Sequence, residues 1–126
     1  MLFKILLTVF LLVSNRSSAD TGISGVATCH GRPVNVFVEL EKQGVTGPVT
    51  LNSMPSEGGN FTIATWRAFE EDKTYYLEIH HNCTKSPPFA ECVATRIILN
   101  NDGIQDLKEI PLEQHNIYKA SDQCNY

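Results

Sequence analysis

Alternation between apolar and polar positions is the dominant pattern along the chain. The clearest example is the segment 34–42. Its first set of alternate positions is apolar and consists of Val34, Val36, Val38 and Leu40. Its second set is mostly polar and consists of Asn35, Phe37, Glu39 and Glu41. Because successive strand side chains point to opposite faces, this pattern predicts a strand with one buried face, and Phe37 is the apolar exception on the outer face.

The same period-two pattern recurs throughout the chain, and no helical period lasts longer than six or seven residues. Strands are expected at residues 22–29, 34–42, 48–54, 60–66, 74–81, 93–99 and 104–112. Turn-forming residues separate them, and a short helix is conceivable only at 67–73. Seven short strands predict an all-β, seven-stranded sandwich of two sheets, because a single sheet would leave an apolar face in water. Trp66 and Phe69 are interpreted as corner packing of this sandwich rather than as a ligand platform.

The first 19 residues differ from the rest. Lys4 precedes an apolar run from Ile5 to Val13 that only Thr8 interrupts, and small residues end the segment at Ala19. This arrangement predicts a secretory signal peptide at 1–19, followed by one domain at 20–126. The apolar run is too short to span a bilayer comfortably, so we expect a secreted, extracellular protein without a membrane anchor.

Charge narrows the range of partners. The chain has 10 Lys and Arg against 14 Asp and Glu. Removal of the leader takes away Lys4 and Arg16, which leaves 8 basic against 14 acidic residues and a net charge of −6. Nucleic acids and anionic lipids attract proteins through a positive field, so this balance argues against nucleic-acid binding and simple lipid adhesion.

Four cysteines lie in the predicted domain, and an even number in an oxidising compartment predicts two disulfides. Three pairings are possible, of which we expect Cys83–Cys92 and Cys29–Cys124. If successive strands are antiparallel, all four cysteines fall at one end of the sandwich. The two bonds would then close a short loop and tie the tail to the end of the first strand.

Metal binding is not expected from spacing alone. His30 adjoins Cys29, and His80 and His81 precede Cys83, but none of these spacings forms a Cys-x-x-Cys zinc pair. His80 and His81 are neighbours on a strand, so they point to opposite faces and cannot hold one ion together. In this register His81 is a hydrogen-bonded histidine on the inner face. The acidic run 70–72 has the character of a solvated turn rather than of a calcium site.

Catalytic patterns are missing, and we expect no enzyme and no cofactor. No serine lies in a Gly-flanked elbow that would support a Ser-His-Asp triad. Two Asn-x-Ser/Thr sequons remain after loss of the leader, at Asn60 and Asn82, and we expect both to be glycosylation acceptors. Disulfide formation at Cys83 competes with glycosylation of Asn82.

Several short motifs carry a family resemblance. In chain order they are GVATCHGRPVNV at 25–36, EGGNF at 57–61, YLEIHHNC at 76–83, Cys92, and IPL at 110–112. Their order and spacing resemble those of the nematode transthyretin-like proteins, and the resemblance covers nearly all of the predicted domain. It implies a transthyretin-like sandwich that is secreted. Family members are mostly of unknown function, and at least one is described as bridging phosphatidylserine on dying cells to a phagocyte receptor.

Three functions are weighed against this background. We expect a non-catalytic binding module for an extracellular protein or a lipid head group. The alternative is a carrier of a small apolar ligand, which would require a tetramer with a channel. A hydrolase of the hydroxyisourate type is disfavoured, because those enzymes end in Tyr-Arg-Gly-Ser and nothing at 121–126 replaces that tetrapeptide.

A binding surface is expected at the end that carries the cysteines. The candidate residues are His30, Arg32, Glu57 and Phe89. Rigid loops with an arginine and an exposed aromatic lose little entropy on binding, which favours them as anchors. The opposite end offers only polar turns at 44–47 and 101–103. Cations for a lipid head group near the cysteine end are Arg32, Lys85 and Lys119.

Overall fold

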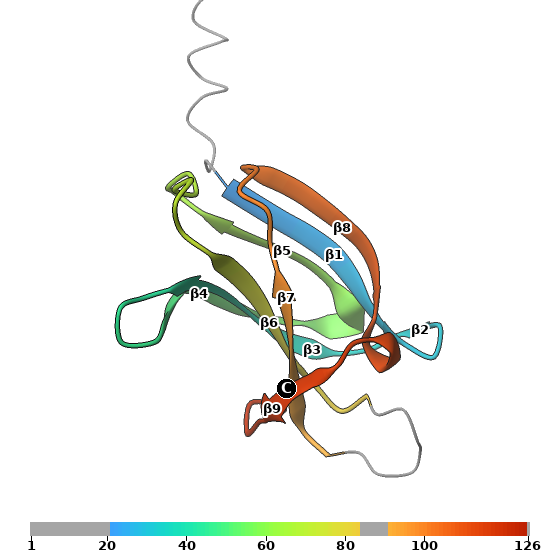
Figure 1. The fold of residues 1–126 in the computed structure, drawn as a ribbon. Helices are drawn as coiled ribbons and strands as arrows, with labels where there is room; N and C mark the ends of the chain where they lie inside the picture. The colour runs from blue at the N-terminus through green and yellow to red at the C-terminus, as the bar shows by residue number, and fades with distance from the viewer. Residues whose placement is uncertain (1–20, 84–90, 126) are drawn as a thin grey trace, which may run out of the picture.

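The computed structural model describes residues 21–83 and 91–125, and it has an all-β architecture of two sheets (Figure 1). The four-stranded sheet contains β1 (Thr21–Cys29), β2 (Arg32–Pro33), β5 (Asn60–Thr65) and β8 (Ile104–Pro111). The five-stranded sheet contains β3 (Val36–Gln43), β4 (Pro48–Ser56), β6 (Tyr75–His81), β7 (Val93–Ile98) and β9 (Ile117–Ala120). Its order is β4-β3-β6-β7-β9, and the 3₁₀ turns η1 (Glu57–Gly59) and η2 (Leu112–Gln114) complete the described elements.

All seven predicted strands are confirmed, with boundaries that shift by a few residues. Two further strands are present, β2 and β9. β2 forms because His30 and Gly31 adopt positive φ angles of 50° and 83°, which turn the chain back onto the end of β1. The short helix considered at 67–73 is wrong, because this segment is a turn in which the Lys73 amide donates to the Glu70 carbonyl.

The core lies between the two sheets, as the alternation predicts. Inward-facing side chains of the five-stranded sheet are fully buried, among them Val38, Leu40 and Ile79. The four-stranded sheet contributes Ile23 and Ile63. Burial of these side chains is the main source of stability, at roughly 25 cal/mol for each Å² of apolar surface removed from water.

The first and last long strands of the domain pair in parallel. β1 and β8 run side by side, with Gly22 opposite Ile104 and Thr28 opposite Pro111 (Figure 1). An irregularity in their register accompanies Lys108, whose φ is 58°. Because the strands are parallel, both finish at the same end of the sandwich, as expected from the sequence.

All four cysteines form disulfides, as predicted, but the expected pairing is wrong. The bonds are Cys29–Cys83 and Cys92–Cys124, with Cα atoms 5.7 and 5.8 Å apart. Cys29 ends β1 and Cys83 follows β6, so the first bond joins the two sheets at one end. β9 pairs with β7, which brings the tail beside Cys92 and explains the second bond. The expected pairing failed because the sequence pattern does not reveal β9.

Corner packing is confirmed for Phe69 and wrong for Trp66. Phe69 is buried and stacks on Tyr75, with ring centroids 3.8 Å apart. Trp66 is 78% exposed. The reason is local: β5 ends at Thr65, whose hydroxyl bonds to the backbone of Arg67, and this turn directs the intervening tryptophan outward.

Candidate functional site

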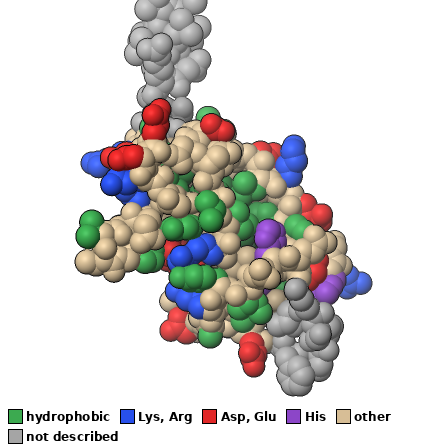
Figure 2. Space-filling view, viewed as in Figure 1, with side chains coloured by type: hydrophobic (Ala, Val, Ile, Leu, Met, Phe, Trp, Pro, Cys, Tyr) green, Lys and Arg blue, Asp and Glu red, His purple; other side chains and the backbone are tan. Residues whose placement is uncertain are grey.

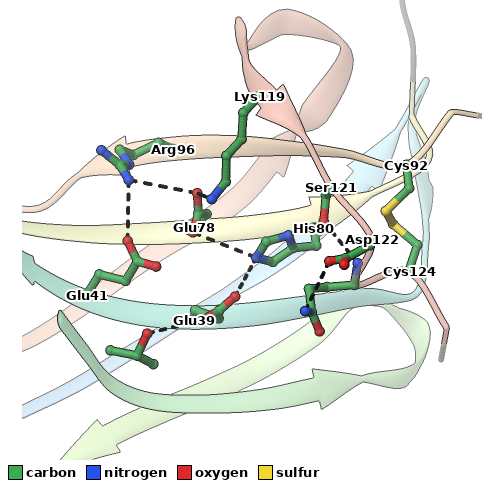
Figure 3. Close-up of polar contacts among 12 residues, drawn as sticks. Glu39, Glu41, Glu78, His80, Cys92, Arg96, Lys119, Ser121, Asp122 and Cys124 are labelled. Carbon is green, nitrogen blue, oxygen red and sulfur yellow. Dashed lines mark hydrogen bonds and ion pairs between the residues drawn. A yellow bond between two sulfur atoms is a disulfide. The ribbon is translucent and has the colours of Figure 1, made fainter. Parts of the chain in front are cut away.

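The outer face of the five-stranded sheet carries a group of charged side chains around β6 (Figure 3). Strand pairing places Glu39 of β3 and Arg96 of β7 on either side of Glu78. We call the group the outer-face cluster, and it consists of Glu39, Glu41, Glu78, His80, Arg96, Lys119 and Ser121. Like charges directly opposite each other on paired strands are destabilising, so the Glu39–Glu78 pair needs compensating partners.

His80 lies at the centre of the cluster and is only 3% exposed. Its Nε2 atom lies 2.6 Å from Glu39 Oε1 and 3.8 Å from Glu78 Oε2. Its Nδ1 atom lies 2.5 Å from Ser121 Oγ, on the segment that follows β9. Phe37, the apolar exception on the outer face, packs against the imidazole with ring centroids 5.9 Å apart. The imidazole is therefore held on both nitrogens and along its ring.

Glu78 is 1% exposed, and its carboxylate interacts with the Glu41 side chain through a hydrogen bond. Its Oε1 atom accepts no hydrogen bond from the residues that the structure describes. The nearest cations are Lys119 Nζ at 3.5 Å and Arg96 Nη2 at 3.9 Å. Arg96 is itself shared, because it lies 3.4 Å from Glu41 Oε2 and stacks between the rings of Tyr76 and Tyr118. A buried carboxylate with ion pairs but incomplete hydrogen bonding costs free energy.

Glu41 has a perturbed acidity within the same cluster. Burial, together with the neighbouring Glu78 carboxylate, raises the pKa of Glu41 to about 7, and the Arg96 guanidinium opposes this change only in part. The cluster therefore holds more carboxylate groups than its cations neutralise, and Glu41 is partly protonated near neutral pH.

His81, the neighbour of His80, belongs to the core. It is 1% exposed, and burial, assisted by the charges of His80 and His115, lowers the pKa of His81 to about 4. The Cys83 amide donates to its Nδ1 at 3.0 Å, so the neutral ring carries its proton on Nε2 and donates to Thr95 Oγ1 at 2.8 Å. The predictions that the two histidines face opposite ways and that His81 is a hydrogen-bonded inner residue are confirmed.

Two groups of described residues bring metal-ligating atoms within 4.8 Å of one another. The first is Cys29, His30 and Cys83, but its two sulfur atoms are joined in a disulfide and do not act as thiolate ligands. The second is Glu39, Glu78 and His80 of the outer-face cluster. The acidic run 70–72 is exposed in a turn, as expected, with Glu70 paired to Lys42 at 2.5 Å.

The predicted binding surface lies where β1 finishes. His30, Arg32 and Glu57 are all exposed there. The His30 amide donates to Glu113 Oε1 at 3.0 Å, and the Gly58 amide donates to Asn35 Oδ1 at 2.8 Å, which fixes both turns. Phe89 lies outside the described residues, as do Lys85 and the predicted signal peptide.

A small pocket of about 230 Å³ adjoins the Cys29–Cys83 bond at this end. Its lining consists of Cys29, Val34, Asn35, Asn82 and Cys83. Asn82, one of the two predicted glycosylation acceptors, is exposed here, and Asn60 is exposed at the start of β5. The two residues of the Cys29–Cys83 bond thus form part of the lining of this pocket.

A larger groove of about 580 Å³ lies at the other end of β3. Its apolar walls are formed by Leu51, Trp66, Phe69 and Tyr75. The hydrophobic side chains of Figure 2 form separate patches among polar ones on the visible face. Exposed Trp66 together with Leu51 makes this groove suitable for an apolar molecule.

The outer-face cluster was not predicted from the sequence. Its signal was present in the alternation, which placed Glu39 and Glu41 on one outer face and Glu78 and His80 on another. What the sequence did not show is that these two strands are neighbours with Glu39 opposite Glu78.

Fold and site together define a two-sheeted, disulfide-bonded all-β protein with a charged cluster on one sheet. No family model, curated protein or solved structure matches the chain. Among the described residues, no helix has the length and apolar character needed to cross a bilayer.

Proposed function

We propose that this protein is a secreted, non-catalytic binding module of the transthyretin-like family that recognises an extracellular protein through its disulfide-braced end. The observation that carries the proposal is the position of the two disulfides. Cys29–Cys83 joins the sheets beside the exposed His30 and Arg32, and Cys92–Cys124 fixes the tail. Such bracing limits the loop entropy that is lost when a partner binds.

Secretion is supported by the pairing of all four cysteines, because disulfides form and persist in oxidising compartments. Transthyretin-like membership rests on the sequence motifs together with the two-sheeted architecture. The braced end also contains the motif residues Gly31, which lies in the β1–β2 turn, and Pro33, which pairs with Thr28 in β2.

A protein partner is favoured over an anionic lipid by charge. The domain without its leader has a net charge of −6, and its field extends over a Debye length of about 8 Å at physiological salt. We expect no cosedimentation with phosphatidylserine vesicles in the presence of chelator. Strong cosedimentation under these conditions would contradict a protein partner and indicate that the partner is a lipid head group.

The partner can be captured by crosslinking from the extracellular fluid of the source organism. The double variant Arg32→Ala with Glu57→Ala should weaken binding of the captured partner at least tenfold in calorimetry. The matched control, Val45→Ser with Asp102→Ala, changes exposed residues at the opposite end and should bind normally. Asn101 is unsuitable as a control because its side chain bonds to the Glu70 carbonyl. Equal affinities for the two double variants would refute the assignment.

The apolar groove favours a second candidate function, carriage of a small apolar ligand. Trp66 is the only tryptophan of the chain and lines this groove, so its fluorescence reports directly on occupancy. A blue shift of the Trp66 emission maximum on titration with anilinonaphthalene sulfonate would support the carrier function, provided that the shift is lost in Leu51→Ser. A channel between subunits also requires a tetramer, which native mass measurement tests independently.

A further inference from the structure

Three potential ligand atoms converge on one point of the outer-face cluster. They are His80 Nε2, Glu39 Oε1 and Glu78 Oε2, and His80 Nε2 lies 2.6 and 3.8 Å from the two oxygens. Two of the three side chains, those of His80 and Glu78, are almost completely buried. Figure 3 shows that the three side chains come from the neighbouring strands β3 and β6 and point toward one another.

Ion pairs within the cluster do not fully account for this arrangement. Two carboxylates, Glu39 and Glu78, face each other across paired strands. Lys119 and Arg96 lie on the Oε1 side of Glu78, at 3.5 and 3.9 Å, and Oε1 accepts no hydrogen bond from described residues. Its Oε2 atom faces His80 instead, beyond hydrogen-bond distance. The Glu78 oxygen that faces His80, Oε2, is therefore not the oxygen that Lys119 and Arg96 approach.

We propose that Glu39, Glu78 and His80 form a binding site for a divalent transition-metal ion, with Zn²⁺ as the preferred ion. An imidazole with two carboxylates suits zinc, whereas calcium prefers six to eight oxygen ligands. Zinc bonds to nitrogen and oxygen at about 2.0–2.2 Å, so its ligand atoms lie about 3.3 Å apart. Small side-chain movements convert the present spacing, all within 4.8 Å, into that geometry.

Ser121 supplies the support that a histidine ligand needs. When Nε2 binds the ion, Nδ1–H donates to Ser121 Oγ, which lies 2.5 Å away. Such outer partners fix the tautomer and the ring orientation of ligating histidines. Ser121 is positioned in turn, because its amide donates to the Cys92 carbonyl at 3.0 Å. The Cys92–Cys124 bond anchors the same segment.

Access to the site is provided by an open cleft of about 400 Å³. Glu39, His80, Ser121 and Asp122 are among its lining residues. Glu39 and His80, two of the three proposed ligands, line this cleft, and three protein ligands leave the fourth zinc position free. The site is therefore built for an ion that keeps a water molecule or takes a ligand atom from another molecule.

The test uses the purified full chain, stripped of metal with chelator and dialysed. Calorimetric titration with ZnCl₂ should give one site, and CaCl₂ should not compete at millimolar concentration. Titration with CoCl₂ should produce visible absorption typical of a low-coordinate Co²⁺ site. This spectroscopic signal needs no variant, so it remains informative if a substituted chain folds poorly.

Variants locate the ion. His80→Gln should weaken zinc binding by more than about 100-fold and remove the cobalt absorption, and Ser121→Ala should weaken it about tenfold. His30→Gln is the matched control, because this exposed histidine adjoins the Cys29–Cys83 bond and is not a proposed ligand. Circular dichroism confirms that each variant is folded. No zinc binding, unchanged binding in His80→Gln, or equal affinity for calcium would each overturn the proposal.

Discussion

His80 and His81 are neighbours in the chain, yet they belong to two different chemical environments. His81 faces the core, where it bonds to Thr95 and to the Cys83 amide. His80 faces outward into the outer-face cluster, where it contacts Glu39 and Ser121. Both are almost completely buried. Burial alone therefore does not define the role of a histidine.

What separates the two residues is the charge of their partners. Burial disfavours the charged form of His81, and the neighbouring His80 and His115 add to this, so the pKa of His81 falls to about 4. Its hydroxyl and amide partners carry no negative charge that would offset this cost. Carboxylates surround His80, so a positive charge is accommodated beside it. The inner face of β6 is built for stability, and its outer face is built to hold a cation.

Loss of a disulfide should give the largest effect on stability. Cys29→Ser with Cys83→Ser opens a bond between residues 54 apart in the chain, which costs about 4 kcal/mol in the chain-entropy model. Cys92→Ser with Cys124→Ser, with a separation of 32, should cost nearly as much. Urea unfolding measures both losses.

Zinc titration then separates the two disulfides. Only the Cys92/Cys124 variant releases Ser121, so only this variant should show weaker zinc binding. An unreduced tryptic digest checks the pairing itself, and it should contain peptide 86–96 joined to 120–126. A digest in which 74–85 is joined to 86–96 would contradict the bonds described.

His81→Ala should have the next largest effect, a loss of about 3 kcal/mol. The variant leaves a cavity among core side chains and removes the acceptor of the buried Cys83 amide. Urea unfolding at pH 7 measures the loss. In the folded protein zinc affinity should stay within a few-fold of the parent value, and a large decrease would show that the two faces are not independent.

Acid should reduce the stabilising effect of His81. Its pKa is about 4 in the folded protein against an ordinary histidine value of 6.5, so between these limits only the unfolded chain binds the proton. The free energy of unfolding therefore falls as pH decreases from about 6.5 to about 4. The difference in free energy of unfolding between the parent protein and His81→Gln should decrease by about 2 kcal/mol from pH 7 to pH 5.

Glu41 should respond to pH with the opposite sign. Its pKa is raised to about 7 from 4.5, so the folded protein holds a proton that the unfolded chain releases between these values. This contribution favours folding as pH falls from about 7 to about 4.5. Comparison of the parent protein with Glu41→Gln isolates this contribution. For His81, the free energies of unfolding of the parent protein and of His81→Gln are compared. A difference between them that does not change with pH would contradict the assignment of His81.

His80→Gln should have the smallest effect on stability, about 1 kcal/mol in zinc-free protein. The variant loses hydrogen bonds to Glu39 and Ser121, but glutamine can replace one of them and the cleft admits water to the other. Thermal unfolding in chelator measures this loss. A loss of stability larger than that of His81→Ala would show that the fold depends more on His80 of the outer face than on His81 of the core.

Alternation was sufficient to predict the seven main strands, because one face of each strand is apolar and buried. The pattern at 34–42 is an example, with Val36, Val38 and Leu40 all fully buried. It failed for β9, whose four residues are all exposed and therefore show no alternation in burial. The expected disulfide pairing was wrong for the same reason, since the position of Cys124 depends on β9.

The candidate site could be predicted only in part. The outward orientation of Glu39 and His80 follows from the alternation, and so does the inward orientation of His81. That β3 and β6 are adjacent strands does not follow from the alternation, because their pairing spans more than 30 residues. Strand order is a property of the whole fold. Trp66 illustrates a second limit, since a side chain in a turn has no alternation to indicate its direction.

The parallel pairing of β1 with β8 also constrains how the chain folds. β1 lies between β5 and β8, and its contacts with β8 join segments about 80 residues apart. Loop closure over such distances is costly, so contacts of this kind slow folding. During synthesis β1 emerges first and must wait for Ile104–Pro111 before this edge is covered. The nascent chain therefore has an unpaired strand edge for most of its translation, when chaperone protection against aggregation matters most.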